Sequence, residues 1–244
     1  MKGMRFSSVP VFRVLSVFVT RMVCLCLLPE SITGESLMSI HESLAIILDW
    51  MRNHAPNVLE GLNPPASAAE IARVESAIGL PLPPCFKEFL SLHNGESGIV
   101  GALLGDGNKL LSCDDIIQQY ELDQDIGRSC QDPDFFSISF WKNRVASQVI
   151  FIKGAVKPLI YHPHWIPITC MNGDILRYID LDPAPTGTIG QVIEVCDENS
   201  SYEILANSFE DLLSHDAQQL IAGDYQFNPE YEEIMLQTPK NILE

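Results

Sequence analysis

Two histidines that stand two positions apart, His162 and His164, are the first candidates for metal chemistry in the sequence. Side chains at positions i and i+2 of a strand point to the same face, so both imidazoles could bind one ion. A metal site usually needs three or four deprotonated ligands. Spacing supplies no third ligand here, although Cys170 and His93 could approach in space. We therefore expect a turn before a strand, with no metal and no other cofactor.

Three aspartates follow closely, and they could form a carboxylate cluster for a divalent cation or for acid–base catalysis. They are Asp174, Asp180 and Asp182, and the last two would lie on one face of a hairpin strand. The strand between them is apolar, however, and Pro183 follows at once. Aspartates are common in turns because they hydrogen-bond to the local backbone, and charges protect strand edges from pairing. We therefore expect turn and edge roles.

Nucleophilic catalysis would fall to Ser112, Cys85 or Cys113. A working nucleophile needs a base within reach and an activated pKa. No sequence pattern pairs any of these residues with a histidine, and the chain contains no GxSxG, P-loop or GxGxxG motif. We therefore predict that the protein is not an enzyme. A hydrolase with an unrecognised site is the alternative.

The net charge of −17 is unevenly distributed. Residues 1–37 carry a net charge of +2, which leaves −19 for the rest of the chain. So acidic a body repels the phosphates of nucleic acids and anionic membrane surfaces. It attracts a basic protein partner. The alternative is that the acidic charge only keeps the protein soluble. We expect a basic protein partner and no nucleic acid, and the oligomeric state stays open.

Seven cysteines are scattered along the chain without a CxxC pair. This spacing does not match the usual zinc sites. An odd number of dispersed cysteines is typical of reduced, mostly buried thiols, which indicates a cytoplasmic protein.

Residues 1–37 differ from the body that follows. Arg13 and Arg21 interrupt their apolar run, which is then shorter than the ~20 residues of a membrane-spanning helix. The segment also has a poor signal-peptide cleavage site, and Met38 opens a stretch that resembles a natural protein start. We expect an extension upstream of the true start and no stable membrane insertion. A signal or anchor and a packed helix are the alternatives.

Helical patterns occupy the first half of the body and strand patterns the second. Apolar spacing predicts helices over about 40–54, 68–78, 86–92, 114–122 and 208–221, with Asn94-Gly95 capping the third at a positive φ. Alternating patterns predict strands over 149–152, 165–169, 175–181 and 191–195, and a hairpin within 101–111. This order predicts an α+β fold, in which several helices cover one face of an antiparallel or mixed sheet. Residues 38–222 form the expected single domain, followed by a loosely ordered acidic tail, 223–244.

Five short motifs in this body resemble the Smi/Knr-type cell-wall assembly regulator family, also called the SUKH superfamily. They are LPLPPCFKEFLSLHNG at 80–95, WIPI at 165–168, GD at 173–174 with IDLDP at 179–183, GQVI at 190–193, and SFEDLL at 208–213. Together they extend the resemblance over about residues 65–222. Two segments depart from the family pattern, namely Cys170-Met171-Asn172 and the long insertion at 123–164.

The resemblance implies a binding domain. Bacterial members of the family resemble immunity proteins that neutralise toxin domains, and fungal members resemble regulatory scaffolds. We expect the immunity role and keep the regulatory role as the alternative. In either role a partner would bind to an acidic surface at the sheet edge, to which the acids of 121–125 and 230–233 would contribute. The candidate contact residues are Asp174, Asp180, Asp182, Glu194, Glu198 and Trp165.

Overall fold

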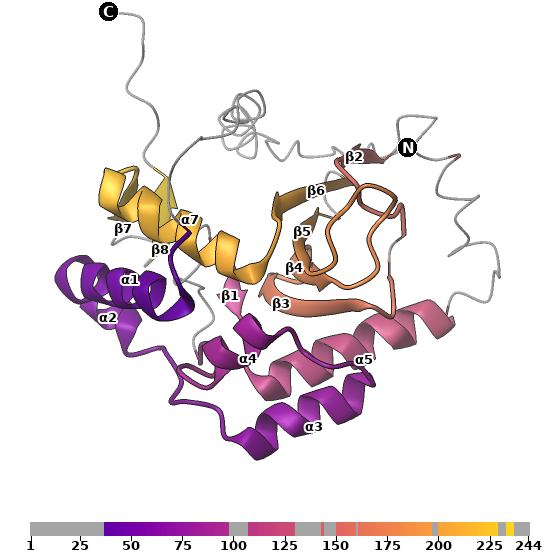
Figure 1. The fold of residues 1–244 in the computed structure, drawn as a ribbon, viewed down its shortest axis with the longest axis horizontal. Coiled ribbons are helices and arrows are strands. Elements are labelled where there is room, and N and C mark those ends of the chain that lie inside the picture. Colours follow the sequence, from indigo (N-terminus) through magenta and orange to yellow (C-terminus); the bar gives the residue numbers. More distant parts are fainter. Residues whose placement is uncertain are drawn as a thin grey trace, which may run out of the picture. The chain divides into compact units, whose positions relative to one another are not determined.

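A computed structural model describes residues 37–97, 107–129, 143, 150–159, 161–196, 200–228 and 233–236. Residues 37–244 form one compact unit, in which a six-stranded sheet lies beside a group of helices (Figure 1). The strand order is β1-β3-β4-β5-β6-β2, and only the β2–β6 pair is parallel. The strands are β1 (Lys109–Leu110), β2 (Phe151–Lys153), β3 (Trp165–Met171), β4 (Ile175–Asp180), β5 (Gln191–Cys196) and β6 (Ser201–Ala206). The predicted α+β fold with a mixed sheet is confirmed.

Several of the described helices start or stop where the sequence provides a cap. They are α1 (Ile40–His54), α2 (Pro56–Leu59), α3 (Ala68–Ile78), α4 (Pro84–Leu90), α5 (Cys113–Ser129) and α7 (Phe209–Ala222). Ser39 and Ser67 each form a capping box with the glutamate three residues later, which satisfies free N–H groups of the first turn. Gly79 and Gly223 end α3 and α7 in the left-handed conformation, which glycine adopts without steric cost.

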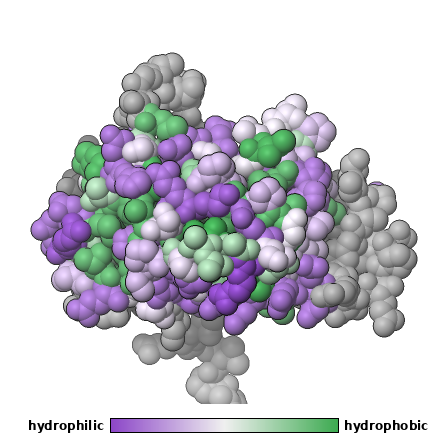
Figure 2. Space-filling view, turned by 60° about the horizontal axis from the view of Figure 1, so that its bottom comes forward, coloured by the Kyte–Doolittle hydropathy of each residue, from purple (hydrophilic) through white to green (hydrophobic). Residues whose placement is uncertain are grey.

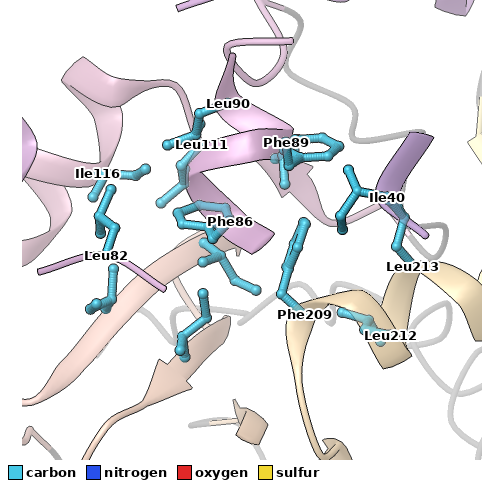
Figure 3. Close-up of a cluster of buried hydrophobic side chains, with 14 of the residues drawn as sticks. Ile40, Leu82, Phe86, Phe89, Leu90, Leu111, Ile116, Phe209, Leu212 and Leu213 are labelled. Carbon is cyan, nitrogen blue, oxygen red and sulfur yellow. The ribbon is translucent and has the colours of Figure 1, made fainter. Parts of the chain in front are cut away.

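The main hydrophobic core lies between the helices and one face of the sheet. Phe209, the first residue of α7, packs edge-on against Phe86 and Phe89 of α4, as Figure 3 shows. Ile166 and Ile179 of the central strands point into the same cluster. This core therefore joins elements that lie far apart in the sequence.

A second buried cluster covers the opposite face of the sheet, which the sequence analysis expected to be open. Ile150, Val156 and Leu159 precede β3 and pack on Trp165 and other sheet residues there. All six positions of β4 are consequently buried. The expectation of a sheet covered on one face only is wrong, because Ile150, just before β2, and Val156 and Leu159, after it, pack on this face.

Several boundaries also differ from prediction. The helix α4 ends at Leu90 with Ser91 as its cap, so Gly95, whose φ is +69°, does not cap it. The helix α5 continues to Ser129, beyond the predicted end near 122. Lys109–Leu110 pairs with β3, and the rest of the predicted 101–111 hairpin lies mostly outside the described residues. In the acidic tail, β7 (Tyr225–Asn228) and β8 (Glu233–Leu236) form a two-stranded antiparallel sheet.

In the described ranges, no helix is both long and apolar enough to cross a membrane. The face drawn in Figure 2 carries small separate hydrophobic patches among hydrophilic side chains, as is usual for a protein surface.

Candidate functional site

The six predicted partner contacts do not form one exposed surface. Trp165 and Asp180 are 1% and 0% exposed, so their assignment to a contact surface is wrong. Both belong to central strands that are covered on two sides, and neither can reach a partner. Asp174 is exposed in the β3–β4 turn, whereas the Glu194 carboxylate lies 3.0 Å from Arg177 Nε in a partly buried ion pair. Glu198 lies outside the described residues, and the acids of the 121–125 stretch include the buried Asp123.

Asp180 holds the loop after β4 against the sheet. Its Oδ1 accepts a hydrogen bond from the backbone N–H of Asp182, and its Oδ2 accepts one from Gln191 Nε2, both at 3.0 Å. Gln191 Nε2 also donates to the carbonyl of Ala155 at 3.0 Å. Burial raises the pKa of Asp180, and the hydrogen bonds from Asp182 and Gln191 act in the opposite direction. The carboxyl therefore serves a structural network.

Asp182 is the centre of a small charged cluster that faces the solvent. Its Oδ2 lies 2.6 Å from Lys157 Nζ, 3.2 Å from His162 Nε2 and 3.8 Å from His164 Nδ1. The hydrogen bond from Lys157 is the main reason that the pKa of Asp182 is lowered. The cluster ties the segment before β3 to the loop after β4.

The same cluster contains the three groups nearest to a metal-ligand set. His162, His164 and Asp182 offer ligand atoms that lie within 4.8 Å of one another, so the third ligand would be Asp182 and not Cys170 or His93. Yet His162 Nδ1 accepts the backbone N–H of His164 at 3.1 Å, which leaves the ring proton of the neutral imidazole on Nε2, towards Asp182. The ammonium of Lys157 already neutralises the aspartate. The residues therefore fit a hydrogen-bonded clamp better than a metal centre.

Excess Zn²⁺ is expected to leave the melting temperature of the protein unchanged. A metal that bound the folded state selectively would stabilise it by mass action, but binding here requires a ring proton and an ion pair to be given up. Differential scanning fluorimetry with Zn²⁺ and with EDTA measures this. A Zn²⁺-dependent rise in the melting temperature that Asp182→Asn abolishes would contradict the assignment of His162, His164 and Asp182 to a hydrogen-bonded clamp.

His162 is expected to make the protein less stable in acid. Burial and the nearby charge of Lys157 lower its pKa to about 4. The unfolded chain takes up this proton near the ordinary pKa of about 6.5, whereas the folded chain does so only near 4. As the pH falls from 6.5 to 4, the free energy of unfolding should therefore drop by about 2–3 kcal/mol from this group, and then level off.

Urea unfolding of the wild type and of His162→Gln across this pH range isolates the contribution of the histidine, because the carboxylates titrate in both proteins. The variant should show a shallower decline between pH 6.5 and 4. Parallel curves for the two proteins would mean that His162 is protonated normally in the folded state.

The candidate nucleophiles have structural roles. Burial raises the pKa of Cys113 to about 11 and also raises the pKa of Cys85, so neither thiol ionises readily near neutral pH. Ser112 Oγ accepts the backbone N–H of Asp115 and donates to the Asp115 carboxylate, which caps the start of α5. These three residues therefore lack the activation that nucleophilic catalysis requires.

An apolar groove lies on the surface between α1, α7 and β7. One part, of about 400 Å³, lies between α1 and the end of α7. An adjoining part, of about 660 Å³, shares Trp50, His54 and Leu220 with the first and continues along β7 past Tyr225 and Phe227. No strand was predicted after residue 223, so the groove was not expected from the sequence. The alternation of Tyr225 and Phe227 with polar neighbours was the available signal.

The fold and these sites define an α+β domain whose motif side chains hold loops and core together and whose groove is open to a ligand. The chain belongs to the SMI1/KNR4 family (SUKH-1), whose sequence model matches residues 65–215. The resemblance seen in the sequence is thus confirmed.

Curated relatives of the chain include fungal proteins named as regulators. The chain is 20% identical over 198 residues to the cell wall assembly regulator SMI1 of Saccharomyces cerevisiae, covering 72% of this chain and 39% of the relative. It is 21% identical to a glucan synthesis regulatory protein of Neurospora crassa, with 77% and 39% covered. It is 30% identical to the cell wall biosynthesis/cell cycle regulator smi1 of Schizosaccharomyces pombe, with 61% and 30% covered. The chain therefore spans less than half the length of these relatives.

Proposed function

We propose that this chain is a regulatory protein-binding domain that acts in the control of cell-wall assembly. The observation that carries the proposal is the family membership, together with the regulator names of relatives from three fungi. Because the chain spans only part of those relatives, their cellular roles are transferred here as a proposal.

The geometry of the candidate residues supports binding over catalysis. Within the described part of the chain, the residues that could carry chemistry are committed to other tasks. Cys113 is a buried thiol of raised pKa, Ser112 caps a helix, and His162 is held as a neutral ring within the clamp. The apolar groove lies apart from these residues. A non-enzymatic function is the simplest one that fits these structural roles.

The net charge and the free cysteines indicate the kind of partner and the cellular compartment. A net charge of −17 favours a basic protein partner through long-range attraction, and Cys85, Cys113, Cys170 and Cys196 are free thiols. Reduced thiols are typical of the cytoplasm, which is the compartment we propose.

The toxin-neutralising role expected from the sequence receives less support than the regulatory one. The relatives reported above are named as regulators of the cell wall or of glucan synthesis. Those names favour the alternative of a regulator or scaffold. A toxin-like protein encoded by the adjacent gene would favour the immunity role instead.

A chimera in yeast tests the cell-wall assignment. The full chain would replace the matched segment of the Saccharomyces cerevisiae regulator in a strain that lacks that regulator, and growth would be scored under cell-wall stress. Restored growth is expected, and the same chimera with the core substitution Phe209→Ala should fail. If a folded chimera expressed at the level of the yeast protein restored no growth, the assignment to cell-wall control would be wrong.

A further inference from the structure

We propose that the groove between α1, α7 and β7 binds an amphipathic segment of a partner protein that carries lysine or arginine beside its apolar side chains. This inference rests on the proposed protein-binding function and names its surface.

Exposed apolar side chains are the first observation that favours binding of a ligand in the groove. Ile221 is 67% exposed at the end of α7, where it lines the groove beside Leu220. Ile46 and Trp50 of α1 form the facing wall and are partly buried against the main core. Removing such surface from water is favourable in proportion to its apolar area, so a ligand with apolar side chains gains free energy here.

One acid lines the groove and a second one adjoins it. Asp49 lines it with a side chain that is 73% exposed, and the exposed Asp224 follows directly after Gly223 of the second part. The nearby basic residue Arg52 lies 3.6 Å from Asp49 in an exposed pair. Exposed pairs of this kind are weak, so a ligand cation can compete for Asp49. The acidic body reinforces the attraction of a basic segment.

Aromatic side chains form the wall along which a cation would lie. Trp50 stacks on His54, with ring centroids 4.5 Å apart and planes inclined by 17°. This contact covers one face of the indole and fixes its orientation. Tyr225 and Phe227 line the same part of the groove from β7. An arginine or lysine placed over an aromatic face gains a cation–π attraction in addition to its ion pair with an acid.

The groove is also formed by elements that are held in place. Ser214 Oγ of α7 accepts the backbone N–H of Met38, just before α1, at 3.1 Å. The N–H of Gly223 bonds to the carbonyl of Gln219, which fixes the chain direction between α7 and β7. A preformed apolar groove that takes anchors from successive turns of a helix is a common mode of peptide recognition. Preorganisation reduces the entropy lost on binding.

A peptide titration of the full chain tests the groove. The probe is a synthetic amphipathic helix of leucine and lysine, about four turns long, and its matched control replaces every lysine by glutamate. Nitrogen-15 NMR would follow the backbone amides of the labelled protein. The leucine–lysine peptide is expected to shift amides of residues 45–54 and 220–227, and the leucine–glutamate peptide is expected not to bind.

Two matched variants decide whether the groove is the site. Ile221→Glu places a charge in the groove and should weaken binding by about tenfold or more. Ile189→Glu makes the same change at a residue that is 74% exposed and does not line the groove, and it should leave the affinity unchanged. Equal affinities for the wild type and Ile221→Glu, shifts confined to other residues, or no binding at all would overturn the proposal.

These experiments distinguish an error in the proposed binding groove from an error in the proposed protein-binding function. If the peptide does not bind the groove while a partner protein binds the wild type and Ile221→Glu equally well, the groove is wrong and the protein-binding function stands. If the chain binds no protein partner, the proposed function fails whatever the peptide does.

Discussion

Replacement of Phe209 by alanine is expected to lower the free energy of unfolding by about 3–5 kcal/mol. The side chain is 1% exposed and lies in edge-on contact with Phe86 and Phe89, at centroid distances of 4.9 and 5.1 Å. The substitution removes a buried ring, forfeits two favourable aromatic contacts and leaves a cavity. Because Phe209 begins α7 and the other two rings lie on α4, the cavity would separate elements that the core joins (Figure 3).

Phe151→Ala is the matched control, since it deletes the same ring where the side chain is 60% exposed on β2. The control should change the free energy of unfolding by less than about 1 kcal/mol. Urea unfolding followed by far-ultraviolet circular dichroism compares both variants with the wild type. Equal losses in the two variants would refute the assignment of Phe209 to the centre of the core.

Replacement of Gly95 by alanine is expected to lower the free energy of unfolding by about 2–5 kcal/mol, from backbone strain and overpacking together. The φ of Gly95 is +69°, and an added Cβ would lie 2.5 Å from the backbone carbonyl carbon of Leu111 and 2.5 Å from the backbone nitrogen of Ser112. Backbone atoms cannot rotate away as a side chain can. The neighbouring residues are also fixed, since Asn94 Oδ1 accepts the N–H of Cys113 at 2.8 Å.

Gly79→Ala separates the two causes of this loss. Gly79 has a φ of +72°, and an added Cβ would have no other atom within 4 Å. Its substitution should therefore cost only the strain of the left-handed conformation, about 1–2 kcal/mol. Calorimetric or urea unfolding of both variants would give the difference. If Gly95→Ala lost no more than Gly79→Ala, the close approach of residues 94–96 to 111–112 would be incorrect.

The helices could be predicted from sequence because their signals are local. A capping box needs only the serine and the glutamate three residues later, so the box at Ser67 and Glu70 was predictable from the sequence, and Ser39 with Glu42 forms a second one. The β3–β4 hairpin has an equally local signal in Asn172-Gly173, both of which adopt positive φ. Such signals act within a few residues and need no knowledge of the remaining fold.

The burial of Trp165 and Asp180 could not be predicted in the same way. Whether a strand residue is covered depends on what packs on its face of the sheet, and here Ile150, Val156 and Leu159 pack there. The pattern in that region predicted only a strand over 149–152, and a strand pattern does not show which face of the sheet the residues after it will cover. An aspartate followed by a turn and a proline resembles an exposed turn residue, and only the tertiary structure brings Gln191 to its carboxylate.

Several residues of the motifs behind the family resemblance have structural roles. Trp165 fills the second core, Asp180 holds the loop after β4, and Gly95 allows two backbone segments to approach closely. Each has a structural reason to be the residue that it is. The groove proposed for partner binding lies instead on α1, α7 and β7, mostly outside those motifs.

Affinity capture with the full chain as bait, followed by mass spectrometry, tests the central claim of protein binding most directly. Extract from the native host would be applied at low and at high salt, with Phe209→Ala as a bait of disrupted core. The account predicts a basic protein that the wild type retains at low salt, that high salt releases because screening weakens exposed charge attraction, and that the disrupted bait does not retain. No protein enriched over blank beads, even after co-expression of the neighbouring gene product, would contradict the claim.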